Sequence, residues 1–215
     1  MTDKNAVDFL DDLFSRYPAL EAVRGEVAAA FEMLRVNFEN GGKAIIGGNG
    51  GSAADAEHIV GELMKGFVRK RPLPEALKDR LISMDPKKGV ALASSLQLGL
   101  PAIALTSHPA LATAFLNDVN GEMAYAQQLL ALGEPGDVFW AISTSGNARN
   151  LEYAMLAAKA MGMQVLGLTG KDGGVMKKYA DVCIVAPAME TYQIQEMHLP
   201  IYHTLCLMLE SVFFD

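Results

Sequence analysis

Short runs of apolar residues, each followed by a segment with helical spacing, alternate along most of this chain. Continuous apolar runs are typical of strands that are buried on both faces of a sheet. Apolar residues three and four positions apart indicate helices instead. Their alternation predicts an α/β fold in which helices flank a parallel sheet. Five strands are expected, at residues 43–47, 101–106, 137–142, 164–169 and 181–185.

The helical spacing also extends ahead of the first strand. Within the first 40 residues apolar side chains recur at helical positions, and Pro18 separates two helices. We therefore expect an N-terminal helical segment, residues 1–40, and a sheet domain, residues 41–215. The segment either packs on the domain or forms an oligomer contact. Further helices are expected at residues 52–67, 109–115, 121–132, 147–161 and 191–213.

Residues 69–100 interrupt the alternation and form a predicted insertion. The insertion starts with a basic, proline-marked run at residues 69–74, and residues 85–89 carry a turn signal. We expect a surface excursion without structure of its own. A lid, or a segment that contacts a partner, is the functional alternative.

Charge, apolar run length and cysteine positions argue against a nucleic-acid-binding, a membrane-spanning or a secreted protein. The net charge of −7 and the pI of about 5.1 argue against a nucleic-acid surface, which needs a basic stripe. No apolar run reaches the ~20 residues that span a membrane, and the acidic N-terminus does not resemble a signal peptide. Cys183 and Cys206 lie in apolar stretches, which favours buried thiols over a disulfide. A soluble cytoplasmic protein is expected, with neither nucleic acid nor membrane as partner.

Glycines follow the first predicted strand, in the segment Gly47-Gly48-Asn49-Gly50-Gly51-Ser52. Backbone N–H groups and the helix dipole make such a strand–loop–helix turn an anion site. The segment fits the dinucleotide fingerprint G-x-G-x-x-A, but no strand ending in an acidic residue follows the helix, and no P-loop lysine is present. A sugar-phosphate or mononucleotide loop remains, with a ligand-free tight turn as the alternative.

The helix after this loop carries His58 and Glu62, one turn apart and therefore on one face. A second loop, Ser143-Thr144-Ser145-Gly146-Asn147, follows the third predicted strand. Its hydroxyl groups can donate to a phosphate, although one such residue would serve equally as a helix N-cap. A phosphate cradle of neutral donors suits an acidic protein.

The last predicted helix adds Gln195, His198 and His203. Gln195 and His203 are about two turns apart and can reach one site from the edge of the helix. Pro200 predicts a local kink that turns His203 inward. Two histidines, a glutamate and a glutamine could hold zinc or another divalent metal if the two helices meet. The alternative is that each histidine is a core residue.

Several ordered stretches resemble the sugar isomerase (SIS) fold family and, within it, the phosphoheptose isomerases. The resemblance runs from about residue 43 to the C-terminus, outside the insertion. It implies a homotetramer with shared active sites, acting in heptose or lipopolysaccharide biosynthesis. The implied reaction interconverts sedoheptulose 7-phosphate and D-glycero-D-manno-heptose 7-phosphate through an enediol. The matching stretches are GNGGSAADAEHIVGEL, NDVNGEMAYAQQLLALGEPGDVFWAISTSGNARN, GMQVLGLTGKDGG and QIQEMHLPIYH.

The resemblance also assigns site residues. Glu62 and His203 fall on the family's acid–base pair. Its zinc positions match His58, Glu62, Gln195 and His203. Its substrate-binding positions match Asn49, Gly50, Gly51, Ser52, Glu62, Asn117, Asp118, Ser143, Thr144, Ser145 and Gln195.

The chain departs from the family pattern around the sugar and phosphate sites. The usual Gly-Arg pair is Lys65-Gly66, a serine is replaced by Ala148, and an aspartate is replaced near Tyr192. Two alternatives to an enzyme stay open. One is a non-catalytic protein of this fold that binds a partner such as a replication initiator, and the other is a sugar-phosphate sensor. Retention of the complete His/Glu/His set favours the enzyme.

Overall fold

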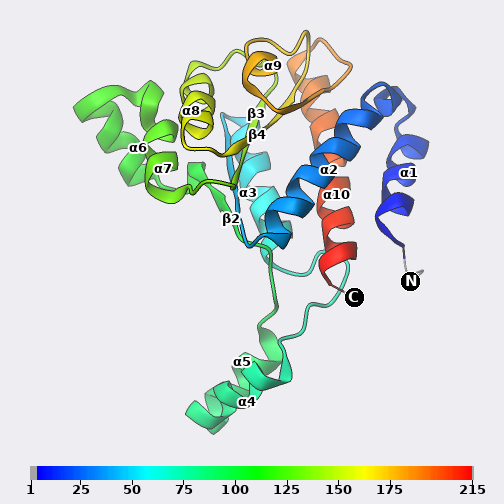
Figure 1. The fold of residues 1–215 in the computed structure, drawn as a ribbon, viewed down its shortest axis with the longest axis vertical. Coiled ribbons are helices and arrows are strands. Elements are labelled where there is room, and N and C mark those ends of the chain that lie inside the picture. Colours follow the sequence, from blue (N-terminus) through cyan, green and yellow to red (C-terminus); the bar gives the residue numbers. More distant parts are fainter. Residues whose placement is uncertain (1–3, 215) are drawn as a thin grey trace.

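A computed structural model describes residues 4–214, so residues 1–3 of the predicted N-terminal segment and residue 215 lie outside the described part. At its centre is a five-stranded parallel sheet in the order β2-β1-β3-β4-β5 (Figure 1). The predicted α/β class and the five strands are confirmed. The strands are β1 (Ala44–Gly48), β2 (Ala102–Ala104), β3 (Val138–Ser143), β4 (Gln164–Thr169) and β5 (Val182–Val185).

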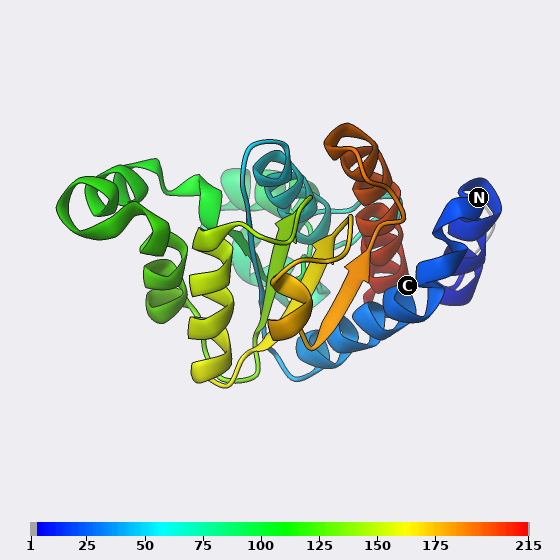
Figure 2. The same ribbon diagram turned by 90° about the horizontal axis from the view of Figure 1, so that it is seen from above.

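Helices cover both faces of the sheet because the strands are apolar on both faces. On β3, Trp140 points into one core and its neighbour Phe139 into the other, and both are fully buried. Figure 2 shows the sheet between the two helical layers. One layer contains α2 (Arg24–Glu39), α3 (Gly51–Met64) and α10 (Thr191–Phe213). The other contains α7 (Ala124–Leu132), α8 (Arg149–Ala160) and α9 (Met176–Tyr179).

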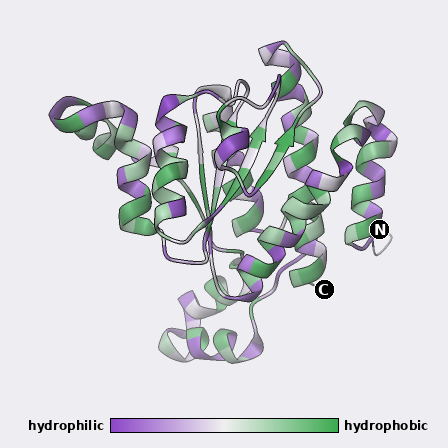
Figure 3. Cartoon of the chain, turned by 45° about the horizontal axis from the view of Figure 1, so that its top comes forward, coloured by the Kyte–Doolittle hydropathy of each residue, from purple (hydrophilic) through white to green (hydrophobic). Residues whose placement is uncertain are grey.

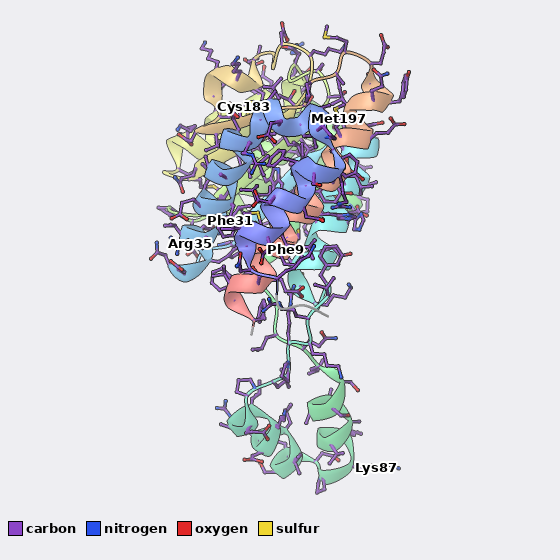
Figure 4. The ribbon with its side chains drawn as sticks, turned by 90° about the vertical axis from the view of Figure 1, so that its right-hand side faces the viewer. Phe9, Phe31, Arg35, Lys87, Cys183 and Met197 are labelled. Carbon is purple, nitrogen blue, oxygen red and sulfur yellow. The ribbon has the colours of Figure 1, made fainter. Side chains whose placement is uncertain are left out.

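The N-terminal helices pack on the domain. Helix α1 (Ala6–Arg16) is followed by a 3-10 turn at Pro18–Val23 and then by α2, so Pro18 separates two helices as predicted. Leu13 and Leu34 are fully buried in the same core as the first sheet face. In Figure 4, α1 and α2 lie over α10, where the side chains of Phe31 and Met197 meet the core. Of the two roles considered for this segment, the structure shows packing on the sheet domain.

The insertion corrects one expectation, because it has structure of its own. It forms a helical hairpin of α4 (Glu75–Met84) and α5 (Pro86–Ser95), which projects from the domain (Figure 1). Asp85 supplies the predicted turn: its carboxylate accepts hydrogen bonds from two backbone N–H groups of α5, and Pro86 occupies the first helical position. Lys87 lies near the far end of the hairpin (Figure 4).

The hairpin joins the domain through a narrow neck in which Pro72 and Gln97 form a β-bridge. Its hydrophobic and polar positions are mixed along both helices (Figure 3), and α4 has no buried residue. Replacing residues 75–95 with a short Gly-Ser linker should therefore leave the domain folded. We expect the thermal midpoint to stay within about 4 °C of the parent, a shift worth roughly 1–2 kcal/mol in a chain of this size. Circular dichroism would check this, and loss of cooperative unfolding would contradict it.

Two smaller predictions can also be compared with the structure. Cys183 and Cys206 are free thiols, and Cys206 is buried. Burial raises the pKa of Cys183 to about 11. No helix within residues 4–214 combines the length and the apolar character that crossing a bilayer requires.

Candidate active site

Two loops meet at the carboxyl edge of the sheet, where the strand order reverses between β1 and β3. Gly48 of β1 is paired with Ile142 of β3, so the loop at residues 49–52 (the first loop) lies beside the loop at residues 143–147 (the second loop). Ligands of open α/β sheets bind at such switch points. The two sequence motifs therefore lie side by side at this edge.

Side-chain amides connect the first loop to the start of α8, the helix that follows the second loop. Asn49 and Asn150 exchange two hydrogen bonds, each 2.9 Å long, between their amide groups. The Tyr125 hydroxyl donates to the carbonyl of Gly48 at 2.5 Å, which fixes the end of β1 from the opposite side. Asn150 and Tyr125 were not predicted as site residues, because neither lies in a loop motif. The residue pattern gives no signal that α7 and α8 approach the first loop.

The loop between β4 and α9, residues 170–175 (the third loop), packs against the second loop. The backbone N–H of Val175 donates to Asn147 Oδ1 at 3.0 Å, and that of Met176 donates to the carbonyl of Gly146 at 2.9 Å. Gly146 has φ +66°, and a Cβ there would lie 2.1 Å from the carbonyl oxygen of Gly173. A side chain at residue 146 would therefore displace the third loop.

The hydroxyls of the second loop precede α8 rather than cap it. The N-cap of α8 is Ala148, which has no side-chain hydrogen bond. Ser143 is buried, whereas Thr144 and Ser145 are half-buried. In the first loop Ser52 is also buried, while Asn49, Gly50 and Gly51 are exposed. The capping alternative is wrong, and the exposed backbone of the first loop remains free to meet an anion.

A cavity of about 560 Å³ lies beside the first loop. Of the predicted substrate residues, Asn49 lines it, and Arg149 supplies a cation at its wall. The Arg149 guanidinium lies 3.2 Å from a carboxylate oxygen of Glu122. Asn117 and Asp118 are exposed and hydrogen-bonded to each other at 2.8 Å. Neither lines the cavity, whereas Leu116 and Asn120 on either side of them do. The walls are Asn49, Leu116, Asn120, Gly121, Glu122, Ala148, Arg149 and Asn150.

The histidines and the glutamate meet along the contact between α3 and α10, which we call the α3–α10 seam. His58 Nε2 lies 3.3 Å from Glu62 Oε1 and 3.4 Å from His203 Nε2. Glu62 is largely covered, with 13 % of its side chain exposed. Lys65, which stands where the family pattern has glycine, places Nζ 3.3 Å from Glu62 Oε2. The seam therefore brings two imidazoles and a carboxylate together from segments far apart in the sequence.

A buried tyrosine orients His58 from behind. The Tyr202 hydroxyl lies 3.0 Å from His58 Nδ1 and 3.2 Å from Asp55 Oδ1. Burial raises the pKa of Tyr202, so the hydroxyl keeps its proton and donates it to Asp55. It can then accept from Nδ1–H of His58, and in that tautomer the Nε2 lone pair points toward Glu62 and His203, as binding a metal would require. Neither Tyr202 nor Asp55 was predicted, since each lies on an apolar or small-residue stretch.

Gln195 lies at the other end of the seam. A Cβ on Gly51 would be 2.3 Å from Gln195 Nε2, so the amide packs against the first turn of α3. Gly51 precedes His58 by seven residues, or about 10 Å along the helix. Gln195 therefore lies about two helical turns along the seam from the His58–Glu62–His203 cluster. His198, between them, is fully buried in the core.

The cluster fits part of a zinc site. Two ligands about 2.1 Å from a tetrahedral ion lie about 3.4 Å apart, which matches the 3.3 and 3.4 Å distances from His58 to Glu62 and His203. However, within the described residues no three His, Cys, Asp or Glu side chains form a complete metal-binding group as they stand. The donor types and the two distances from His58 fit the ion, whereas the remaining distances of the set do not yet form a closed site.

Burial lowers the pKa of His203, and the neighbouring His58 lowers it further. A lowered pKa keeps the imidazole neutral near pH 7. Neutral imidazole can accept a proton or bind a metal, and either role needs the free lone pair. The electrostatics of the seam therefore suit both roles predicted for His203.

Comparisons with known proteins match this chain in sequence and in fold. A sequence profile of the SIS domain matches residues 87–170. Phosphoheptose isomerase from Thiobacillus denitrificans is 37 % identical over 201 residues, which cover 92 % of this chain and 89 % of the relative. The chain belongs to the phosphoheptose isomerase family. A second relative, from Geotalea daltonii, is 39 % identical over 189 residues, covering 88 % of this chain and 85 % of the relative.

Solved phosphoheptose isomerase structures share the fold. That from Neisseria gonorrhoeae is 31 % identical with a TM-score of 0.73, and covers 96 % of each chain. That from Francisella tularensis is 28 % identical with a TM-score of 0.74, and covers 96 % of this chain and 98 % of its own. The predicted family is confirmed, and with it the prediction of a phosphosugar isomerase rather than a non-catalytic member of the SIS fold.

Proposed function

We propose that this phosphosugar isomerase interconverts sedoheptulose 7-phosphate and D-glycero-D-manno-heptose 7-phosphate. The His58–Glu62–His203 cluster is the observation that carries the proposal. A partly covered carboxylate beside a neutral imidazole supplies the base and the acid that aldose–ketose isomerisation needs. The relatives named phosphoheptose isomerase support a seven-carbon substrate.

In this proposal the two loops hold the phosphate. The backbone of Gly50 and Gly51 and the hydroxyls of Ser143, Thr144 and Ser145 donate hydrogen bonds to it. Ser52, Asn49 and the Asn117–Asp118 pair serve the sugar hydroxyls. The phosphate and the reacting carbons are at opposite ends of a heptose phosphate. The loops and Glu62 correspondingly lie at opposite ends of α3.

Glu62 and His203 then move the protons. The carboxylate of Glu62 removes the proton from the carbon beside the carbonyl and returns it to the neighbouring carbon. His203 transfers a proton between the two oxygens, so the ketose and the aldose differ only in where two hydrogens sit. The ammonium group of Lys65 lies 3.3 Å from the Glu62 carboxylate and pairs with it at the edge of the site.

Zinc or another divalent metal is proposed as the cofactor. His58, Glu62 and His203 would hold it. Gln195, the fourth ligand predicted by resemblance, would have to turn away from Gly51 to join them. When bound, the metal would act as a Lewis acid on the sugar oxygens. A homotetramer with shared sites is proposed as well, since the His58 side chain remains 42 % exposed in the single chain. A place in heptose or lipopolysaccharide biosynthesis follows from the same substrate.

Proton exchange tests the proposed reaction directly. The protein, purified without added metal and analysed for bound metal, is incubated in heavy water with a panel of ketose and aldose phosphates of five, six and seven carbons. NMR should show deuterium entering the carbon beside the carbonyl, fastest with the heptose phosphates. Faster turnover of a shorter sugar would overturn the substrate, and absence of exchange with every sugar would overturn the reaction.

Tyr202 gives a prediction about the metal. Tyr202→Phe removes the hydroxyl that fixes His58 and leaves the ring packing in place. Loss of such a supporting contact typically lowers metal affinity about 10- to 100-fold. Competition with a chromogenic chelator would measure the zinc affinity. Tyr125→Phe, which loses a hydroxyl bonded to Gly48 instead, is the matched control and should bind zinc as the parent does. Equal affinities in all three proteins would contradict the role of Tyr202.

A further inference from the structure

One arginine of the basic run at the start of the insertion, Arg71, forms a fully buried ion pair with Glu210 of α10. Arg71 and Glu210 have no exposed side-chain surface, and Arg71 Nη2 lies 2.9 Å from Glu210 Oε1. The Arg71 guanidinium also packs 4.3 Å above the ring of Phe214. A sequence of arginines and lysines next to prolines predicts a solvated surface, so this burial was not expected. The cost of removing both charges from water offsets their attraction, so a buried ion pair adds little to the free energy of unfolding by itself.

Arg71 contacts the end of the helix that carries the proposed base. Its Nη1 donates to the carbonyl of Leu63 at 2.6 Å, and its Nη2 donates to the carbonyl of Glu62 at 3.1 Å. These carbonyls lie in the last turn of α3, where no further turn of the helix can satisfy them. A positive charge at this position is also favourable to the helix dipole. Arg71 thereby fixes the backbone from which the Glu62 side chain projects.

Glu210 acts on the other member of the acid–base pair. Its carboxylate accepts hydrogen bonds from three consecutive backbone N–H groups, those of Phe67 (2.8 Å), Val68 (2.9 Å) and Arg69 (3.1 Å). These bonds hold the Phe67 ring 5.3 Å from the ring of His203, which is seven residues earlier on α10. One carboxylate therefore connects α10, the start of the insertion and the surroundings of His203.

We propose that Arg71 and Glu210 are positioning residues that set the distance between Glu62 and His203. The inference rests on the proposed function, since it concerns the geometry of the same acid–base pair. Three observations meet in it: complete burial of both charges, bidentate contact of Arg71 with the end of α3, and the Glu210-held segment that covers His203. The planar fork of arginine is needed, because an ammonium group cannot reach two carbonyls and a carboxylate in one plane.

The tests are the conservative variants Arg71→Lys and Glu210→Gln. Each should lower kcat at least tenfold while KM for the sugar phosphate stays within twofold, because the phosphate loops lie at the other end of α3. Phe67→Leu, a milder change that keeps an apolar side chain over His203, should lower kcat severalfold and remains informative if either buried variant fails to fold. The NMR resonances of the His203 ring, recorded without substrate, should shift in all three proteins.

Asp137→Asn is the matched control. Asp137 is another buried carboxylate that accepts from two backbone N–H groups and pairs with a lysine, Lys43, but it joins the segments before β1 and β3. It should lose stability without losing kcat. Positioning is overturned if the folded Arg71 and Glu210 variants keep kcat within twofold of the parent, or if Asp137→Asn lowers kcat equally. An inactive parent protein would refute the proposed function instead, and the His203 resonances would still test the positioning.

Discussion

Glu62→Gln is expected to reduce isomerisation by about two to four orders of magnitude, the usual contribution of a general base. Glutamine preserves the shape of the side chain but cannot accept the proton from the sugar carbon. Folding should be retained, because the Glu62 side chain lies at the edge of the seam and not in the core. The measurement is the rate of deuterium incorporation beside the carbonyl, followed by NMR in heavy water.

The matched control for this variant lies on the same helix. Glu57→Gln changes an exposed carboxylate that accepts a hydrogen bond from Thr106 at 2.9 Å, and it should retain activity. Zinc content and binding of the sugar phosphate are measured in both proteins, so that loss of the metal is separated from loss of the base. Undiminished exchange in Glu62→Gln would remove this residue from the mechanism.

The stability of the protein is expected to fall as the pH drops from 7 to 5, largely because of His198. This side chain is fully buried, and burial lowers its pKa to about 4. Nε2 donates to the carbonyl of Thr169 at 3.1 Å, and no group within residues 4–214 bonds to Nδ1. The folded protein therefore holds this imidazole neutral, whereas the unfolded chain protonates it near the ordinary value of about 6.5.

The stability changes with pH in the direction set by the state, folded or unfolded, that binds more protons. Between pH 6.5 and 4 the unfolded chain binds the extra proton, so the free energy of unfolding decreases as the pH falls. For this shift the decrease is about 2 kcal/mol at pH 5 and roughly 3 kcal/mol below pH 4. Urea unfolding at pH 7 and pH 5 measures it. His198→Gln, which can still donate to Thr169, should lose about 2 kcal/mol less than the parent between these values.

His108→Gln provides the comparison for that experiment. His108 is exposed and contacts Gln128 through Nδ1. Its replacement should leave the pH dependence of unfolding unchanged. If His198→Gln retained the full loss of stability between pH 7 and pH 5, other groups would be responsible for the acid sensitivity.

The sheet was predictable because its signal is local. Continuous apolar runs such as residues 137–142 mark buried strands without information from the rest of the chain, and the structure places β3 one residue later. The same holds for the glycine loop and for the i, i+4 pair of His58 and Glu62. By contrast, α4 and α5 were missed because the prolines and the turn signal of the insertion were given more weight than the helical spacing of Leu77, Leu81 and Met84. Their start signals, Pro74 and Asp85, were taken as breaks.

The supporting contacts of the site could not be predicted from local patterns. Arg71 lies in a basic run, and only the fold brings it to Glu210, 139 positions later. Tyr202 lies in an apolar helix, and its hydroxyl gains a role only because α10 packs beside Asp55. Gln195 was grouped with the histidines by spacing, yet the structure places its amide two turns away, at Gly51. Residue type suggested the chemistry, whereas long-range packing decided which groups meet.

The contact between His58 and His203 spans 145 positions and depends on the last helix of the described chain. During synthesis, every strand and the first half of the site emerge from the ribosome before α10 does. A nascent chain that stops short of α10 lacks one of the two imidazoles and also the helix that covers part of one face of the sheet. On the proposed mechanism, the acid–base pair is therefore assembled only after the final helix has been synthesised and has packed against α3.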